Sequence, residues 1–218
     1  RDVVGIGQSG QELDIYFDDS FVGNTTTTDS GIFSYDLFIE RETELGPHRV
    51  KVVFMGSELY TESSGDVRSD IQAATIFQVE NIETFRLQEF FISAYLVDDL
   101  NNPMSDQVVN MTFGNTKYLL VTDSSGFVQK NMTLSAVHDL GMYTILWDYN
   151  GYDYYLPTTR DQTLVVVALT SISIESDPDV LVGESFGFSG RIVDDMGNPL
   201  STDLKFLFHG QDVETLQT

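Results

Sequence analysis

The sequence predicts an all-β fold of tandem β-sandwich or barrel modules that repeat about every 95 residues. Two acidic segments are near-copies of one another, Tyr95–Met104 (YLVDDLNNPM) and Arg191–Leu200 (RIVDDMGNPL). A fixed period of this kind is the mark of a repeat architecture. Apolar and polar residues alternate in many segments, as in Val109–Phe113, which is the pattern of a half-buried strand. No segment of useful length has a helical period.

Other segments recur in the same register. The strand pattern Leu13–Phe17 corresponds to Val109–Phe113 and then to Leu204–Phe208. Three more pairs lie about 95 positions apart: Asp29–Phe33 with Ser124–Val128, Leu45–Val50 with Leu140–Ile145, and Gly56–Tyr60 with Gly151–Tyr155. Agreement at several separated places within about one residue of register makes the repeat the organising feature of the chain.

The period divides the chain into residues 1–73, 74–168 and 169–218. We expect the second part to be a complete module, the first to lack its first two strands, and the third to stop after the strand near Phe208. Within the complete module seven strands are expected, at about 75–79, 87–97, 107–113, 117–122, 126–134, 142–149 and 162–168. Short strands at this spacing, with Gly, Asn, Asp and Pro between them, indicate a sandwich or barrel. The alternation in Phe33–Ile39 likewise predicts a strand.

The junctions between modules carry no flexible Gly/Ser linker. The last strand of the second module continues directly into the first strand of the third through Thr163–Thr170. We therefore expect stiffly joined modules that form a rod.

The composition limits the classes of function. Thirty-four acidic and 11 basic residues give a formal net charge of −23, which repels nucleic acid and anionic lipid and attracts cations. Without cysteine there is no disulfide, thiolate zinc site or cysteine nucleophile. No apolar run approaches the roughly 20 residues that cross a bilayer, so we expect no membrane insertion in this sequence. Because Arg1 is not a start residue, we expect a mature or internal part of a longer protein.

One motif suggests a nucleotide cofactor. Gly5–Gly10 matches G-x-G-x-x-G, which binds a dinucleotide when a helix follows it. The residues that follow, Leu13–Phe17, have a strand pattern instead. We interpret the glycines as a loop and expect no cofactor here.

The residues resemble tandem immunoglobulin-like repeats of prokaryotic, especially archaeal, cell-surface proteins. Val182–Leu200 is similar to their segment VGESVTISGRLTDDNGNPL, Gly141–Tyr149 to their strand G-x-Y-T-V-x-V-x-Y, and Gly151–Thr159 to their corner GDxxYLPSS. Phe85–Phe90 departs from the pattern, because the VGES turn is missing there. The resemblance implies immunoglobulin-like β-sandwich modules of the kind found in S-layer proteins, adhesins, surface filaments and large secreted enzymes.

Acidic doublets are the candidate metal site. Asp98, Asp99, Asp194 and Asp195 end strands in equivalent positions of two modules. Calcium takes six to eight oxygen ligands, and extracellular modules bind it weakly. The same residues are also ordinary turn formers, because Asp and Asn bond to their own backbone. The turn is the favoured interpretation and a Ca²⁺ site is the alternative.

Three sequons make this a candidate glycoprotein: Asn24, Asn110 and Asn131 each begin N-x-[ST]. Asn24 is expected in a loop and Asn110 on the outward face of a strand, so both could carry sugar.

Aromatic residues and histidines offer weaker candidates. Tyr152 and Tyr154 are the best exposed positions for stacking on a carbohydrate, whereas Trp147 aligns with Val52 in a strand and is expected in the core. His48, His138 and His209 fall at non-equivalent places without a marked nucleophile, so no catalytic residue is assigned.

We therefore expect a non-catalytic structural array on the extracellular cell surface or envelope, an S-layer, stalk or filament. It would act as a rigid spacer or assemble with other copies of itself or with neighbouring modules of the same chain. Residues 169–218 contain the two strands that residues 1–73 lack, so assembly could proceed by strand donation. An adhesin or glycan-binding module and an accessory region of a large secreted enzyme are the alternatives.

Overall fold

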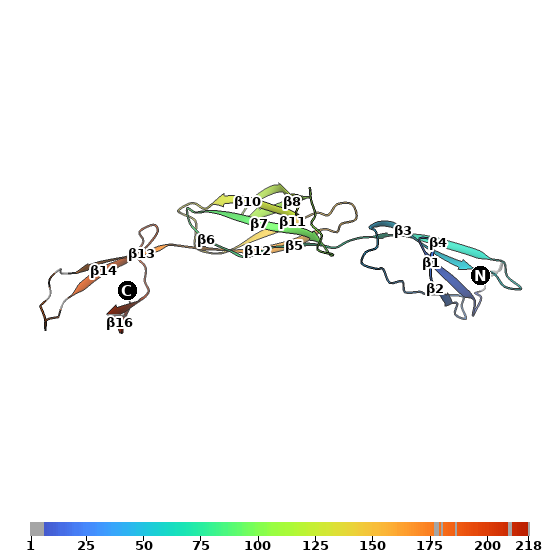
Figure 1. Cartoon of the computed structure of the whole chain (residues 1–218), viewed down its shortest axis with the longest axis horizontal. Coiled ribbons are helices and arrows are strands. Elements are labelled where there is room, and N and C mark those ends of the chain that lie inside the picture. Colours follow the sequence, from blue (N-terminus) through green and yellow to red (C-terminus); the bar gives the residue numbers. More distant parts are fainter. Residues whose placement is uncertain (1–6, 177–178, 180, 186, 209–210, 218) are drawn as a thin grey trace.

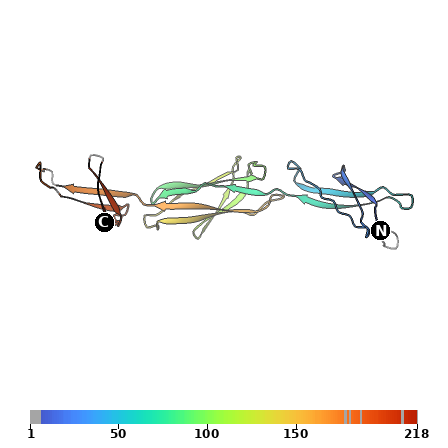
Figure 2. The ribbon, with the colours of Figure 1, turned by 90° about the horizontal axis from the view of Figure 1, so that it is seen from below.

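A computed structural model describes residues 7–217, apart from positions 177–178, 180, 186 and 209–210, and these residues form sixteen β-strands and no helix. The predicted all-β fold is confirmed. The strands form three groups along the long axis of the molecule (Figures 1 and 2). We call them the N-terminal unit (β1–β4), the middle unit (β5–β12) and the C-terminal unit (β13–β16).

The N-terminal unit is a single antiparallel sheet with the strand order β2-β1-β3-β4. Its strands are β1 (Glu12–Phe17), β2 (Ser20–Thr26), β3 (Gly46–Phe54) and β4 (Ser63–Ile71). Among the described residues, no second sheet covers this one.

The middle unit is a sandwich of two sheets, with strand orders β10-β7-β5 and β6-β12-β11-β8-β9. Its strands are β5 (Thr75–Gln78), β6 (Ile82–Phe85), β7 (Glu89–Asp98), β8 (Val108–Phe113), β9 (Thr116–Val121), β10 (Phe127–Thr133), β11 (Gly141–Tyr149) and β12 (Thr158–Val167). All seven expected strands are present. The sequence did not predict β6, which pairs with β12 in the parallel sense.

The C-terminal unit contains two antiparallel pairs, β13 with β14 and β15 with β16. The strands are β13 (Thr170–Ser176), β14 (Phe188–Asp194), β15 (Asp203–Phe208) and β16 (Gln211–Gln217). The register of β13 and β14 matches that of β5 and β7, because Thr170 lies opposite Asp194 as Thr75 lies opposite Asp98.

The core lies between the two sheets of the middle unit. Trp147 is completely buried there, as predicted, and packs against Phe77 with ring centroids 5.9 Å apart. Its indole Nε1–H donates to Oε1 of the buried Gln162, at 2.9 Å, which satisfies the polar atom that a buried tryptophan carries. Ile92, Leu96 and other apolar side chains of both sheets complete the cluster.

The prediction of a strand at Phe33–Ile39 is wrong. These residues belong to no sheet, and Phe33 and Phe38 are exposed. Their counterpart in the middle unit is β10, whose partner is β7. A strand needs hydrogen bonds from a neighbour, and the described part of the N-terminal unit contains no counterpart of β7.

The glycine-rich segment is a loop, as predicted, in its described part from Gly7 to Gly10, and the strand β1 follows it. The hydrogen bond that follows this loop recurs in the middle unit, 95 or 96 positions later. Gln11 N–H donates to Thr27 Oγ1 as Gln107 N–H donates to Thr122 Oγ1, at 3.0 and 2.9 Å. The loop therefore leads into a strand in the same way in both units, and it provides no helix N-terminus for a phosphate.

The connections between the units are short. Three residues separate β4 from β5, and only Ala168 and Leu169 separate β12 from β13. Ala73, in the first connection, is buried and exchanges backbone hydrogen bonds with Tyr154 and Leu156.

Candidate functional site

The two acidic turns are built alike. Asp98 Oδ1 accepts hydrogen bonds from the backbone of Leu100 and Asn102, and its Oδ2 accepts one from Asn102 Nδ2 at 2.9 Å. Asp194 makes the same three bonds with Met196 and Asn198. Both turns are therefore closed by the first Asp of the doublet and the Asn four residues later, which is Asx-turn chemistry.

The second turn also receives a cation from another unit. Arg86, which follows β6, donates from Nε to Asp195 Oδ2 at 3.2 Å and from Nη2 to Asp194 Oδ2 at 3.3 Å. Nη2 also pairs with Asp195 Oδ1, and Nη1 lies 3.4 Å from the sulfur of Met196. The sequence alone did not reveal this contact between positions more than 100 apart. The available signal was the departure from the family pattern at Phe85–Phe90.

The ion pair changes the acidity of its members. The side-chain hydrogen bond from Asn198, the backbone bonds of the turn and the Arg86 guanidinium lower the pKa of Asp194 to about 2. The hydrogen bond to Asp195 raises the pKa of Arg86. Each charge thus favours the ionised form of the other.

The calcium hypothesis for Asp98, Asp99, Asp194 and Asp195 remains a prediction. Among the described residues, no group of three or more His, Asp or Glu side chains is arranged to hold a metal ion. Asp98 and Asp194 already use both carboxylate oxygens within their turns. A cavity of about 420 Å³ between the N-terminal and middle units is lined by Asp98, Asp99 and the loop at 39–45.

The sequons lie in three different environments. Asn24 is exposed but stands within β2 rather than in the expected loop, and its Nδ2 donates to Glu12 at 2.7 Å. Asn131 is exposed on β10 and pairs with Glu89. Asn110 alternates with the core residues Val109 and Met111, but the expectation that it is accessible to carry sugar is wrong, because the residue is 5% exposed and its side chain donates to Asp148. Asn110 lies in β8, which is flanked in its sheet by β9 and β11, and its partner Asp148 stands opposite it on β11.

The two candidate tyrosines are not equivalent. Tyr152 is 70% exposed on the corner after β11. Tyr154 is half-buried, and its ring lies against Gly46 of the N-terminal unit, where an added Cβ would come within 3.3 Å of it. Tyr154 is thus part of a junction, and Tyr152 is the more accessible of the two.

The histidines form no catalytic arrangement in the described part of the chain. His48 bonds to Asp18 Oδ2 at 2.5 Å and to the carbonyl of Glu44 at 2.6 Å. His138 packs against the rings of Phe113 and Tyr143. His209 lies outside the described residues.

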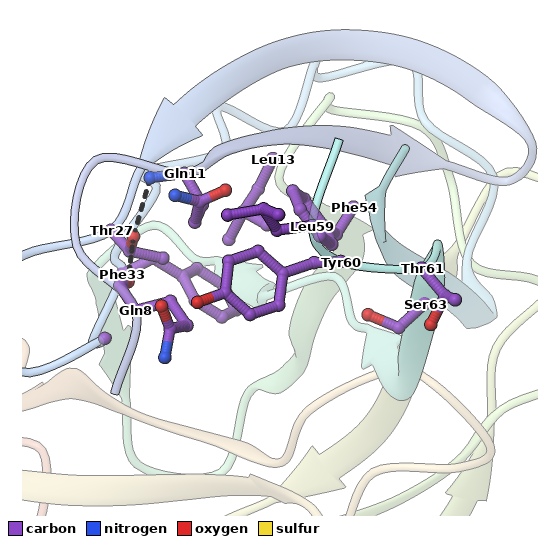
Figure 3. Close-up of a pocket in the computed structure, with 11 residues that line it drawn as sticks. Gln8, Gln11, Leu13, Thr27, Phe33, Phe54, Leu59, Tyr60, Thr61 and Ser63 are labelled. Atoms are coloured by element: carbon purple, nitrogen blue, oxygen red, sulfur yellow. Dashed lines mark hydrogen bonds between the residues drawn. The ribbon is translucent and has the colours of Figure 1, made fainter. Parts of the chain in front are cut away.

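A groove follows the uncovered face of the N-terminal sheet (Figure 3). It has a volume of about 520 Å³, and Leu13, Phe54, Leu59 and Tyr60 gather in it beside the polar Gln8 and Gln11. The counterparts of Leu13 and Phe54 in the middle unit, Val109 and Tyr149, are buried in the core. The groove therefore lies on the apolar inner face of the sheet, where Leu13 and Ile15 are buried although no second sheet of the described residues lies on it.

Comparison with known proteins gives no family assignment. No family model matches the sequence, and no curated protein matches it. Structural neighbours include a bacterial ice-binding adhesin, with 12% identity over 97% of this chain and 72% of that chain and a TM-score of 0.35. Domains 1–6 of the surface layer protein SbsC have 15% identity over 94% of this chain and 28% of that chain, with a TM-score of 0.34. A β-glucuronidase of Parabacteroides merdae has 11% identity over 70% of this chain and 21% of that chain, with a TM-score of 0.27.

Two of these three neighbours are surface proteins, and the third is an enzyme of which this chain spans about a fifth. At TM-scores of this size the likeness carries no argument about function. Within the described residues, the structure contains no helix that is long and apolar enough to cross a membrane.

Proposed function

We propose that this chain is a non-catalytic structural part of an extracellular cell-surface protein, in which β-sandwich units form a stiff spacer. The observation that carries the proposal is the way the units are joined. Two residues connect β12 to β13, and a buried ion pair between Arg86 and Asp194–Asp195 forms a second attachment across the same junction. Two attachments restrict the rotation that a single flexible linker would allow.

The charge supports an extracellular setting. A net charge of −23 keeps such a surface soluble in salt and repels anionic polymers and lipids. The partners proposed are neighbouring modules, other copies of the chain and the cell envelope.

Small-angle X-ray scattering tests the spacer function. A rod gives a pair-distance distribution with a long linear tail, and its maximum dimension does not change with temperature below unfolding. A distribution that fits only an ensemble of independently oriented units would reject the stiff spacer. Labelling of intact producing cells with an antibody to the chain tests the surface location, and labelling only after lysis would reject it.

Self-assembly by strand donation is a second candidate, and the uncovered N-terminal sheet favours it. Val67 on this sheet is exposed, whereas its counterpart Gln162 in the middle unit is buried. Ile172 on β13 is exposed as well, although its counterpart Phe77 is buried. The β13–β14 pair of a second copy could cover the sheet as β5 and β7 do in the middle unit. In the assembled module, β1–β2 of the acceptor and β15–β16 of the donor correspond to the same strands, β8–β9 of the middle unit. The donor's β15–β16 would therefore have to move away from its own β13–β14.

Engineered cysteines test strand donation, because the native chain has none. Gln129 lies opposite Ser93 in the middle unit, so Ser34 of one copy should lie opposite Ser189 of another. Strand donation predicts disulfide-linked dimers and longer chains for Ser34→Cys with Ser189→Cys. The control pair Ser34→Cys with Ser173→Cys, on the more distant β13, should give none. Equal cross-linking by both pairs, or by neither, would reject this route.

Glycan binding is a third candidate, which the exposure of Tyr152 favours. Aromatic faces of this kind stack on sugar rings. Titration of envelope glycans against Tyr152→Ala tests it, with Tyr60→Ala at the equivalent corner of the N-terminal unit as the matched control. Unchanged affinity of the Tyr152 variant would remove the idea.

A further inference from the structure

The contact between Arg86 and the second acidic turn joins two separately built surfaces. On the middle unit, Arg86 is held by a turn whose next residue, Leu87, has a φ of 64° and donates its N–H to Leu134 O at 3.0 Å. A left-handed non-glycine residue is kept only where its surroundings determine it. The middle unit thus fixes the position of Arg86 with its own bonds.

The acidic surface is fixed in the same way. Asp194 Oδ1 accepts the backbone N–H groups of Met196 and Asn198, at 2.9 and 2.8 Å, so the carboxylate is oriented by its own turn. Its Oδ2 then remains directed at Asn198 Nδ2 and at Arg86 Nη2. The carboxylate of Asp195 receives two guanidinium nitrogens side by side. This bidentate geometry requires a particular orientation of both groups.

The side chains of the ion pair are largely covered, although the residue Asp195 as a whole is exposed. The side chains of Arg86, Asp194 and Asp195 are 7%, 9% and 14% exposed. Charges that are buried in this way are costly when separated, whereas exposed pairs contribute little. A change in the angle between the units would therefore expose the charges of Arg86, Asp194 and Asp195 to water or leave them without their partners.

We propose that Arg86 and the Asp194–Asp195 doublet form an ionic lock that sets the angle between the middle and C-terminal units. The Asp194–Asp195 doublet is the part of the C-terminal unit that Arg86 of the middle unit binds. Met196, on the same turn as the doublet, also places its sulfur 3.4 Å from Arg86 Nη1.

The first junction is built differently. The Asp98 turn has the same internal bonds, yet within the described part of the chain no ion pair reaches it from the N-terminal unit. The ring of Tyr154 lies there against Gly46 instead. Two turns of the same construction thus have different partners, and the lock belongs to the second.

Distance measurements between spin labels test the lock. Labels on Lys117→Cys in the middle unit and Glu175→Cys in the C-terminal unit occupy exposed strand positions, and no native cysteine interferes. The native background should give one narrow distance distribution. Arg86→Gln should widen it at least twofold, and Arg160→Gln, an exposed arginine on β12 with the same change in charge, should leave it unchanged.

Asp195→Asn removes the lock from the C-terminal side and should widen the distribution as Arg86→Gln does. Because it lies outside the middle unit, it also serves if circular dichroism shows that Arg86→Gln does not fold. The double variant should be no wider than either single variant, since both remove one interaction. An unchanged width in Asp195→Asn, or an equal effect of Arg160→Gln, would overturn the proposal.

Discussion

His48 and Tyr143 close the same loop in two different units. His48 Nε2 donates to the carbonyl of Glu44 at 2.6 Å, and Tyr143 Oη donates to the carbonyl of Asp139 at 2.7 Å, in each case four residues back. Each ring also lies against a phenylalanine, Phe17 or Phe113, at 5.0 and 6.0 Å between centroids. One unit thus closes this loop with an imidazole and the other with a phenol.

The stability of the N-terminal unit should therefore fall as the pH rises. Both ring nitrogens of His48 face acceptors, the Asp18 carboxylate and the Glu44 carbonyl, so the ring must carry two protons. These bonds, the one to Asp18 first, raise the pKa of His48 above its ordinary 6.5. The stabilisation is complete below about pH 6.5 and is lost as the pH rises through the raised value.

Thermal unfolding between pH 5 and 9, with the His48 ring followed by NMR, measures this effect. His48→Tyr, which copies the middle unit, should keep the loop and lose the pH dependence. A His48 pKa at or below 6.5 would contradict the prediction.

Acid should weaken the second acidic turn only at low pH, as the pH falls toward the pKa of Asp194 of about 2. Asp194 has a pKa of about 2 against an ordinary 3.8. Its contribution to stability is present above about pH 4 and is lost as the pH falls toward 2. Acid unfolding of the native chain, compared with Asp194→Asn, measures the difference. The variant should lack the part of the acid transition between pH 4 and 2, and superimposable curves would refute this assignment.

Core substitutions at equivalent positions should have unequal costs. Trp147→Ala should lower the free energy of unfolding of the middle unit by about 3–5 kcal/mol, because it removes a fully buried side chain. Val52→Ala, at the same strand position of the N-terminal unit, should cost about 1 kcal/mol or less, because Val52 is only half-buried. Urea unfolding followed by circular dichroism compares them. Similar losses would mean that Val52 is covered in solution.

Calcium should stabilise the chain no more than sodium chloride at the same ionic strength. The carboxylates of Asp98 and Asp194 are occupied by their turns, and the excess negative charge is screened equally by both salts. Melting temperatures in the two salts, with and without chelator, measure this. A larger rise with millimolar Ca²⁺ that chelator reverses would assign a cation to the turns.

Glycosylation should depend on exposure. In a host with N-glycosylation machinery, mass spectrometry should find sugar at Asn24 and Asn131 and none at Asn110, whose amide is buried against Asp148. Asn110→Gln should leave the glycan mass unchanged. Sugar on Asn110 would mean that β8 is accessible before the unit folds.

The sequence predicted the strands of the middle unit well because they alternate and are separated by turn residues. It did not predict β6, which is four residues long and pairs with a strand about 80 positions away. Phe33–Ile39 has the pattern of a strand but not the partner, and pattern alone cannot supply hydrogen bonds.

The candidate sites depended more on tertiary contacts. The turn chemistry of Asp98 and Asp194 is local, so residue types four positions apart were enough to suggest it. The burial of Asn110 depends on β9 and β11, which alternation along β8 does not describe. The role of Arg86 depends on residues of another unit, and the irregular segment Phe85–Phe90 marked its position but not its partner.

The parallel pairing of β6 with β12 determines how the middle unit bears a pulling force. Four residue pairs join the two strands, from Ile82 opposite Leu164 to Phe85 opposite Val167. Tension enters the unit through the chain before β5 and leaves it after β12, so it pulls β6 and β12 in opposite directions along their length. Their hydrogen bonds lie across this direction and must break together rather than one at a time. We therefore expect β6, which the sequence did not predict, to resist the pulling force once β5 has separated from β7.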